Sequence, residues 1–136
     1  MALPKNLYEN REIFLEEIEK SSKEFGESNK NIVKTILFGS ILTEKFDVGS
    51  DLDILIILKN SEYERYFDRI PEFLSFFNKK VSIPVGIFPY TEDEIIRMLK
   101  TENPFIKRVL KEGKILYKKS KRSIIKYLNR NLLYFV

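Results

Sequence analysis

Apolar and polar residues succeed one another along the chain in blocks whose periods predict both helices and strands. Residues 32–38 and 52–58 are two short apolar runs, which we expect to form strands. The second run is apolar on both faces, so it predicts a central strand of a sheet. A third strand is expected over 81–88, and Pro84, which lacks a backbone donor, indicates that it lies at an edge or starts irregularly. A short fourth strand is expected over 115–117.

Most of the remaining blocks have helical spacing. Pro71 must lie at a break or at a new helix start, Thr91 opens a capping box, and Gly26 suits the C-terminal cap of the first helix. The helices are expected over residues 5–25, 41–45, 61–79, 91–100, 104–113 and 120–133.

This order predicts an α+β fold, in which a small mixed sheet of three to four strands is packed with helices. The length of 136 residues suits one domain with a single core. We expect residues 1–117 to form that domain. Residues 118–136 are expected to form a basic amphipathic C-terminal helix that packs on the domain or extends it.

Charge is distributed unevenly between the two ends of the chain. Residues 1–112 carry 17 basic and 20 acidic side chains, whereas residues 113–136 carry seven basic ones and no acid. The basic end has three interpretations: a solvated helix face, a helix that docks on a protein, or a nucleic-acid contact. We favour the first and regard nucleic acid as the weakest.

Composition excludes several kinds of site. The chain has no Cys and no His, which excludes disulfides, zinc ribbons, Cys nucleophiles and the Ser-His-Asp triad. Mg²⁺ prefers oxygen ligands, so a magnesium site remains compatible with this composition. No apolar run approaches the roughly 18 residues of a membrane span, and the N-terminus lacks the apolar core of a signal peptide, so we expect a cytoplasmic protein. Abundant Lys, Glu and Ile favour a thermophilic source.

Gly39 and Ser40 follow directly on the first predicted strand. A strand that ends in Gly and turns into a helix presents backbone N–H groups to which a phosphate can come close. Ser40 can add a hydroxyl donor. The alternative is an ordinary strand-to-helix turn in which Ser40 caps the helix.

Asp51 and Asp53 stand at the start of the second predicted strand. Side chains two apart on a strand point to the same side, so the two carboxylates repel unless a cation lies between them. A divalent metal ion that also contacts a triphosphate would remove the repulsion. The alternative is a turn in which Asp51 is a cap and Asp53 is solvated.

The combination Gly39-Ser40, ten residues, Asp51-x-Asp53, with Ser50 before the first Asp, resembles the signature of the nucleotidyltransferase (DNA polymerase β-like) superfamily. It is most similar to the short minimal nucleotidyltransferases. The resemblance implies that the Gly-Ser turn binds the triphosphate of ATP. Ser50 and Lys45 are further nucleotide-binding candidates.

The same resemblance implies a cofactor, a reaction and a partner. Asp51 and Asp53 would bind Mg²⁺ and act in catalysis. The reaction would move a nucleoside monophosphate, AMP from ATP, onto a hydroxyl of a protein or small-molecule acceptor. Many short members resemble antitoxins that pair with a HEPN-domain toxin. Whether this chain forms a homodimer stays open.

The chain departs from the family pattern at Gly86, which stands in Val85-Gly86-Ile87-Phe88 where active members carry a third carboxylate. Thr43 stands near the place of a common Arg. Residues 92–94 and, more weakly, Asp47 are candidate substitutes for the missing acid, although helix capping already explains residues 92–94. We favour an enzyme. The alternative is a weakened or inactive binding module, and a small nucleic-acid-binding protein ranks last because it leaves Asp51 and Asp53 unexplained.

Overall fold

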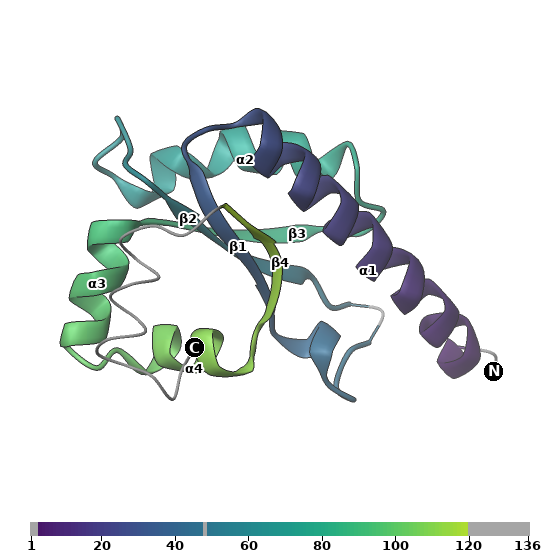
Figure 1. Cartoon of the computed structure of the whole chain (residues 1–136). Coiled ribbons are helices and arrows are strands. Elements are labelled where there is room, and N and C mark those ends of the chain that lie inside the picture. The colour runs from purple at the N-terminus through teal and green to yellow at the C-terminus, as the bar shows by residue number, and fades with distance from the viewer. Residues whose placement is uncertain (1–2, 48, 120–136) are drawn as a thin grey trace.

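A four-stranded mixed sheet lies at the centre of the protein, in the order β3-β2-β1-β4 (Figure 1). The computed structural model describes residues 3–47 and 49–119, and of residues 3–9 only the backbone. β1 is antiparallel to both of its neighbours, β2 and β4, whereas β2 and β3 are parallel. The strands are β1 (Ile32–Phe38), β2 (Leu52–Leu58), β3 (Val85–Thr91) and β4 (Lys114–Lys118).

Helices cover both faces of this sheet (Figure 1). α1 (Leu3–Ser28) and α2 (Ile70–Asn78) pack on one face, and α3 (Glu92–Lys100) and α4 (Pro104–Glu112) on the other. The α+β class and the four strands are therefore confirmed.

The residues of β2 divide between two hydrophobic cores because alternate side chains point to opposite faces. Ile54 and Ile56 lie in the core under α1 and α2, while Leu55 and Ile57 lie in the core under α3 and α4. All four are fully buried. This confirms β2 as a central strand and explains why its run is apolar on both faces.

Several predicted boundaries differ from the structure. The helix expected over 61–79 is wrong over 61–65, since a 3-10 turn, η2 (Tyr66–Arg69), precedes α2 and Pro71 lies in the first turn of α2. The strand expected from residue 81 begins at Val85, and it lies at a sheet edge as predicted. The carbonyl of Pro84 accepts a hydrogen bond from the Leu52 amide at 3.0 Å. Pro84 therefore joins the start of β3 to β2 through its acceptor alone, and its missing N–H group is not needed.

Gly26 is not a helix cap, because α1 continues to Ser28. A Cβ at this position would overlap the ring of Tyr117 on β4. The glycine therefore serves a close helix–strand contact rather than the end of the helix.

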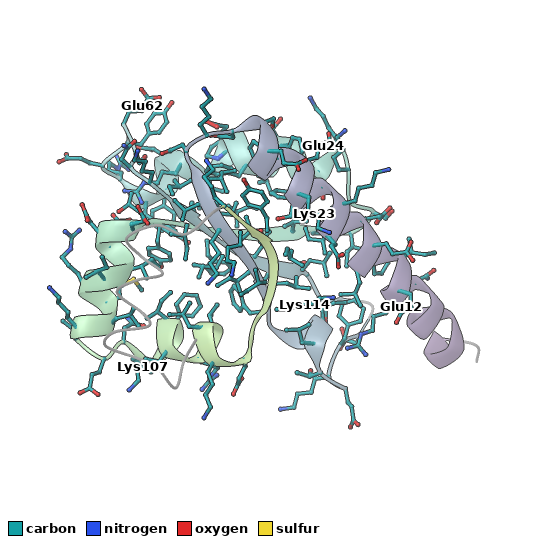
Figure 2. The ribbon with its side chains drawn as sticks, viewed as in Figure 1. Glu12, Lys23, Glu24, Glu62, Lys107 and Lys114 are labelled. Atoms are coloured by element: carbon teal, nitrogen blue, oxygen red, sulfur yellow. The ribbon has the colours of Figure 1, made fainter. Side chains whose placement is uncertain are left out.

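Charged side chains such as Lys23, Glu24 and Lys107 project outward from the helices (Figure 2). No helix in the ranges 3–47 and 49–119 is both long enough and apolar enough to cross a membrane. The helix expected over 120–133, and with it the basic C-terminal segment, lies outside the described residues.

Candidate active site

The bend after β1 is built around Gly39, whose φ is +90°. This left-handed value strains any residue with a Cβ. The chain then forms a single 3-10 turn, η1 (Ser40–Leu42), in place of the α-helix expected over 41–45. The amides of Leu42 and Thr43 close the turn by donating to the carbonyls of Gly39 and Ser40, at 3.1 and 2.8 Å. The first amides of such a turn have no partner within it, and this leaves donors for an anion.

Asp53 lies against this bend. It pairs with Phe38 in the β1–β2 register, and its place on β2 sets its side chain on the face covered by α3 and α4. A Cβ built on Gly39 would lie 2.7 Å from the Asp53 Oδ2 atom. The two parts of the predicted motif are thus brought together, and the glycine makes room for the carboxylate.

Asp51 precedes β2, two residues before Asp53, and is exposed. Burial, and next to it the charge of Asp51, raise the pKa of Asp53 above its usual range. Among the ion pairs and side-chain hydrogen bonds of residues 10–47 and 49–119, none involves either carboxylate. The two acids therefore have the environment of a cation site without a protein cation in it.

Gly86 lies beside Asp53 on the neighbouring strand, since the two residues are partners in the β2–β3 register. A Cβ on Gly86 would lie 2.6 Å from Asp53 Oδ1. The two oxygens of Asp53 thus each face a glycine, one on either side. In the described part of the chain, no group of three or more acidic residues is close enough together to hold a metal ion.

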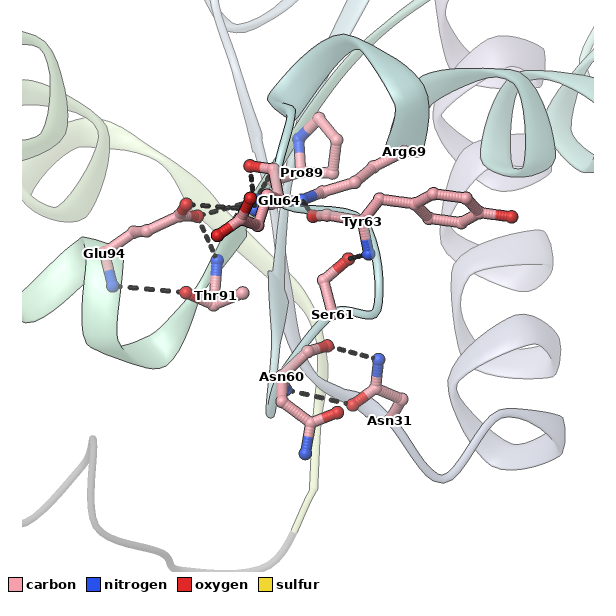
Figure 3. A network of polar contacts seen from close by, with 9 residues as sticks. All are labelled: Asn31, Asn60, Ser61, Tyr63, Glu64, Arg69, Pro89, Thr91 and Glu94. Atoms are coloured by element: carbon pink, nitrogen blue, oxygen red, sulfur yellow. Dashed lines mark hydrogen bonds and ion pairs between the residues drawn. The ribbon is translucent and has the colours of Figure 1, made fainter.

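Two of the candidate substitute acids, Glu94 and Asp47, have partners of their own. Glu94 accepts two hydrogen bonds from Arg69, at 2.6 and 3.0 Å, and closes the predicted capping box with Thr91 (Figure 3). Asp47 accepts from the Gly49 amide at 2.9 Å. These contacts give Glu94 and Asp47 structural roles.

The other predicted nucleotide contacts, Ser50 and Lys45, occupy different surroundings. The Ser50 hydroxyl donates to the Asp47 carboxylate at 3.2 Å and accepts from the Asp47 amide at 3.1 Å, so it closes the loop before β2. Lys45 is exposed, and its amide donates to the Thr43 hydroxyl at 3.1 Å.

Lys45 also lines a cleft of about 660 Å³ between the η1 turn and α4. Phe105 and Arg108 of α4 face this cleft, and neither was among the sequence candidates. The signal that could have found them is helical spacing, since Phe105, Arg108 and Glu112 recur on one face of an amphipathic helix. The sequence does not show that this face of α4 lies beside the Gly39 bend, because the two are more than sixty residues apart in the chain. The cleft is lined by Phe38, Gly39, Leu42, Thr43, Lys45, Phe105, Arg108, Val109 and Glu112.

Comparisons with known proteins identify the fold and the family of this chain. The crystal structure of a candidate nucleotidyltransferase from Sulfolobus solfataricus superimposes with a TM-score of 0.56 and 22% sequence identity, over 84% of this chain and 88% of that one. This likeness confirms the nucleotidyltransferase fold. None of the curated proteins compared matches the chain. The model of the family described as polymerase beta nucleotidyltransferases matches residues 19–122. The chain therefore belongs to the polymerase beta nucleotidyltransferase family.

Proposed function

We propose that this protein is a Mg²⁺-dependent nucleotidyltransferase that moves AMP from ATP onto a hydroxyl group of a protein or small molecule. The observation that supports this proposal best is the Asp53 carboxylate, which lies against the Gly39 bend beside a second acid and without a cation from the described part of the chain. A phosphate group could bind the backbone amides of the bend, and a metal ion could bind the two carboxylates.

The donor set fits magnesium. Asp51 and Asp53 would hold the ion with carboxylate oxygens, and the triphosphate would supply further oxygen ligands. The ion would neutralise charge on the phosphates as the leaving group departs. Because only two carboxylates meet here, binding of the ion and binding of the nucleotide are expected to depend on each other.

The reaction is an in-line substitution at the α-phosphorus. The acceptor hydroxyl oxygen forms the new P–O bond, the bond to the β-phosphate oxygen breaks, and pyrophosphate leaves with the electron pair while the hydroxyl proton passes to water. The backbone of the Gly39 bend would orient the phosphates, and most of the rate gain would come from this positioning.

Binding of Mg·ATP to the purified protein, measured by calorimetry, tests this proposal. We expect Asp53→Asn to weaken Mg·ATP binding at least about tenfold, since a charged metal ligand is lost. Asp68→Asn, which changes an exposed acid of η2, is the matched control and should bind like the wild type. Equal binding by the wild type and Asp53→Asn contradicts the proposal.

Gly86 favours a second candidate function, a binding module that kept the fold and lost most of its catalysis. Active relatives of the kind this sequence resembles have a carboxylate where Gly86 adjoins Asp53. As such a module the protein would act as an antitoxin that binds a HEPN-domain protein, and the complex would survive Asp51→Ala and Asp53→Ala. A complex that requires both acids and ATP excludes this candidate.

The substitution Gly86→Asp separates the two functions. A Cβ on residue 86 would lie 2.6 Å from Asp53 Oδ1, so the Asp53 carboxylate must shift in Gly86→Asp and in Gly86→Asn alike, and only Gly86→Asp adds a third carboxylate to the site. Transfer of labelled AMP to an acceptor should be faster in Gly86→Asp than in Gly86→Asn, which has the same shape without the charge. Equal transfer by the two variants shows that the missing acid does not limit catalysis.

A further inference from the structure

We propose that the cleft between the η1 turn and α4 holds the nucleoside end of the triphosphate, with Phe105 as the surface on which the base stacks and Arg108 as a phosphate-binding cation. This inference rests on the proposed function and names the residues by which that function would recognise its nucleotide. Phe105 and Arg108 lie far from Gly39 in the sequence, and the fold brings them to the same cleft.

Two of the apolar residues that line the cleft are aromatic. Phe38 and Phe105 both line the cleft, and their ring centroids are 5.5 Å apart at an interplanar angle of 78°. Phe88 packs against both, at 5.2 and 5.7 Å. All three rings are only partly buried at the edge of the core under α3 and α4. Exposed aromatic faces suit a nucleobase, because every base has a π-face that can stack.

The charged residues that line the cleft are mainly cationic. Lys45 and Arg108 are both exposed, and neither forms an ion pair with any side chain of residues 10–47 and 49–119. Glu112 is the one acid among the lining residues that the structure describes. Two cations without acidic partners beside a glycine bend favour an anionic ligand, and the planar guanidinium of Arg108 can donate to two phosphate oxygens at once.

Position and size point to the same ligand. Gly39 belongs both to the cleft and to the bend against which Asp53 lies, so a ligand with its phosphates at Gly39 can extend into the cleft. The volume of about 660 Å³ falls within the range typical of small-molecule and cofactor sites. Aromatic rings, two cations and an adjoining pair of carboxylates together match a nucleoside triphosphate with its metal ion better than a lipid or a peptide.

Two probes, Mg·ATP and inorganic tripolyphosphate with Mg²⁺, separate the two roles. Arg108→Gln should weaken binding of both probes about tenfold, since it removes a charge-assisted contact to phosphate. Phe105→Leu keeps an apolar side chain in the core but removes the aromatic face, so it should weaken Mg·ATP about five- to tenfold. The same variant should bind tripolyphosphate like the wild type, which also shows that its fold is intact.

Matched controls lie outside the cleft. Arg97→Gln changes an exposed arginine of α3, and Phe67→Leu changes an aromatic ring that is 72% exposed on η2. Both controls should bind the two probes like the wild type.

The outcomes also distinguish this inference from the proposed function. If Mg·ATP binding requires Asp53 but is unchanged in Arg108→Gln and Phe105→Leu, the cleft is not the nucleoside site. The proposed function is not contradicted by that result. A wild-type protein that binds neither probe overturns both. Equal losses of Mg·ATP and tripolyphosphate binding in Phe105→Leu contradict stacking, and a normal affinity in Arg108→Gln contradicts the phosphate contact.

Discussion

At Gly39 two structural requirements fall on one residue. Its φ of +90° belongs to the region that L side chains rarely adopt, and the space that a Cβ would fill is occupied by the Asp53 carboxylate. The first requirement concerns the stability of the bend, and the second concerns the place of a proposed metal ligand. A substitution at this position should therefore affect folding and nucleotide binding together.

We expect Gly39→Ala to lower the free energy of unfolding by about 1–3 kcal/mol, the usual cost of a strained backbone conformation. It should also weaken Mg·ATP binding more than the lost stability explains, because the new methyl group displaces Asp53. Denaturant unfolding measures the first effect, and calorimetry well below the melting temperature measures the second. Gly49→Ala is the control, since the nearest atom to a Cβ there is 3.6 Å away. Unchanged Mg·ATP affinity in the folded Gly39→Ala variant contradicts the proposed contact between bend and carboxylate.

The site residues that the sequence identifies can all be recognised from the residues next to them in the chain. Gly39, Asp51 and Asp53 stand at the ends of two apolar runs, so the strand period alone predicts where they lie. Arg108 could not be assigned in this way, because its place beside Gly39 depends on how α4 packs across the sheet. Long-range packing of this kind leaves no local signal apart from an amphipathic face.

At the level of whole elements, long-range contacts that the local sequence does not reveal also explain why some predicted helix and strand boundaries are wrong. β1 and β2 are predicted well because both runs are predominantly apolar. The capping box of α3 is predicted because Thr91 and Glu94 are three residues apart. The helix expected over 61–79 starts late because Arg69 is drawn inward. It is only 4% exposed and donates to the carbonyls of Tyr63 and Glu64, which holds the preceding segment outside any helix.

At the contact between α1 and β4, helix propensity and packing predict opposite effects of a substitution on stability. Ala is the better helix former, so helix propensity alone favours Gly26→Ala by up to about 1 kcal/mol. In this protein the added methyl group meets the ring of Tyr117, and overpacking of this kind costs about 1–3 kcal/mol. We therefore expect Gly26→Ala to lower the free energy of unfolding, as measured by denaturant titration.

A double-mutant comparison isolates the cause of that loss. In the background of Tyr117→Leu, where the ring is gone, Gly26→Ala should be neutral or stabilising. If Gly26→Ala destabilises both backgrounds equally, the ring of Tyr117 is not what excludes a larger residue.

At the scale of the whole molecule, one ion pair joins segments that the sequence separates. Arg69 connects the segment before α2 to the Pro89 carbonyl of β3, at 3.2 Å, and to Glu94 of α3 (Figure 3). Burial acts to raise the pKa of Glu94, but hydrogen bonds from Arg69 and Thr91 outweigh it and lower that pKa below the usual 4.5. The folded state therefore favours the ionised form, and this stabilisation is lost as the pH falls through the lowered pKa.

Glu94→Gln should consequently destabilise the protein in a pH-dependent way. At pH 7 we expect a loss of about 3 kcal/mol in the free energy of unfolding, because the buried Arg69 charge loses its charged partner and keeps only neutral acceptors. As the pH falls from about 5 through the lowered pKa, wild-type Glu94 takes up a proton and the difference between the two proteins should shrink. Glu24→Gln breaks an exposed pair with Lys80 and should cost less than about 1 kcal/mol. A constant difference between wild type and Glu94→Gln at all pH values would show that the carboxylate contributes by shape and hydrogen bonding rather than by its charge.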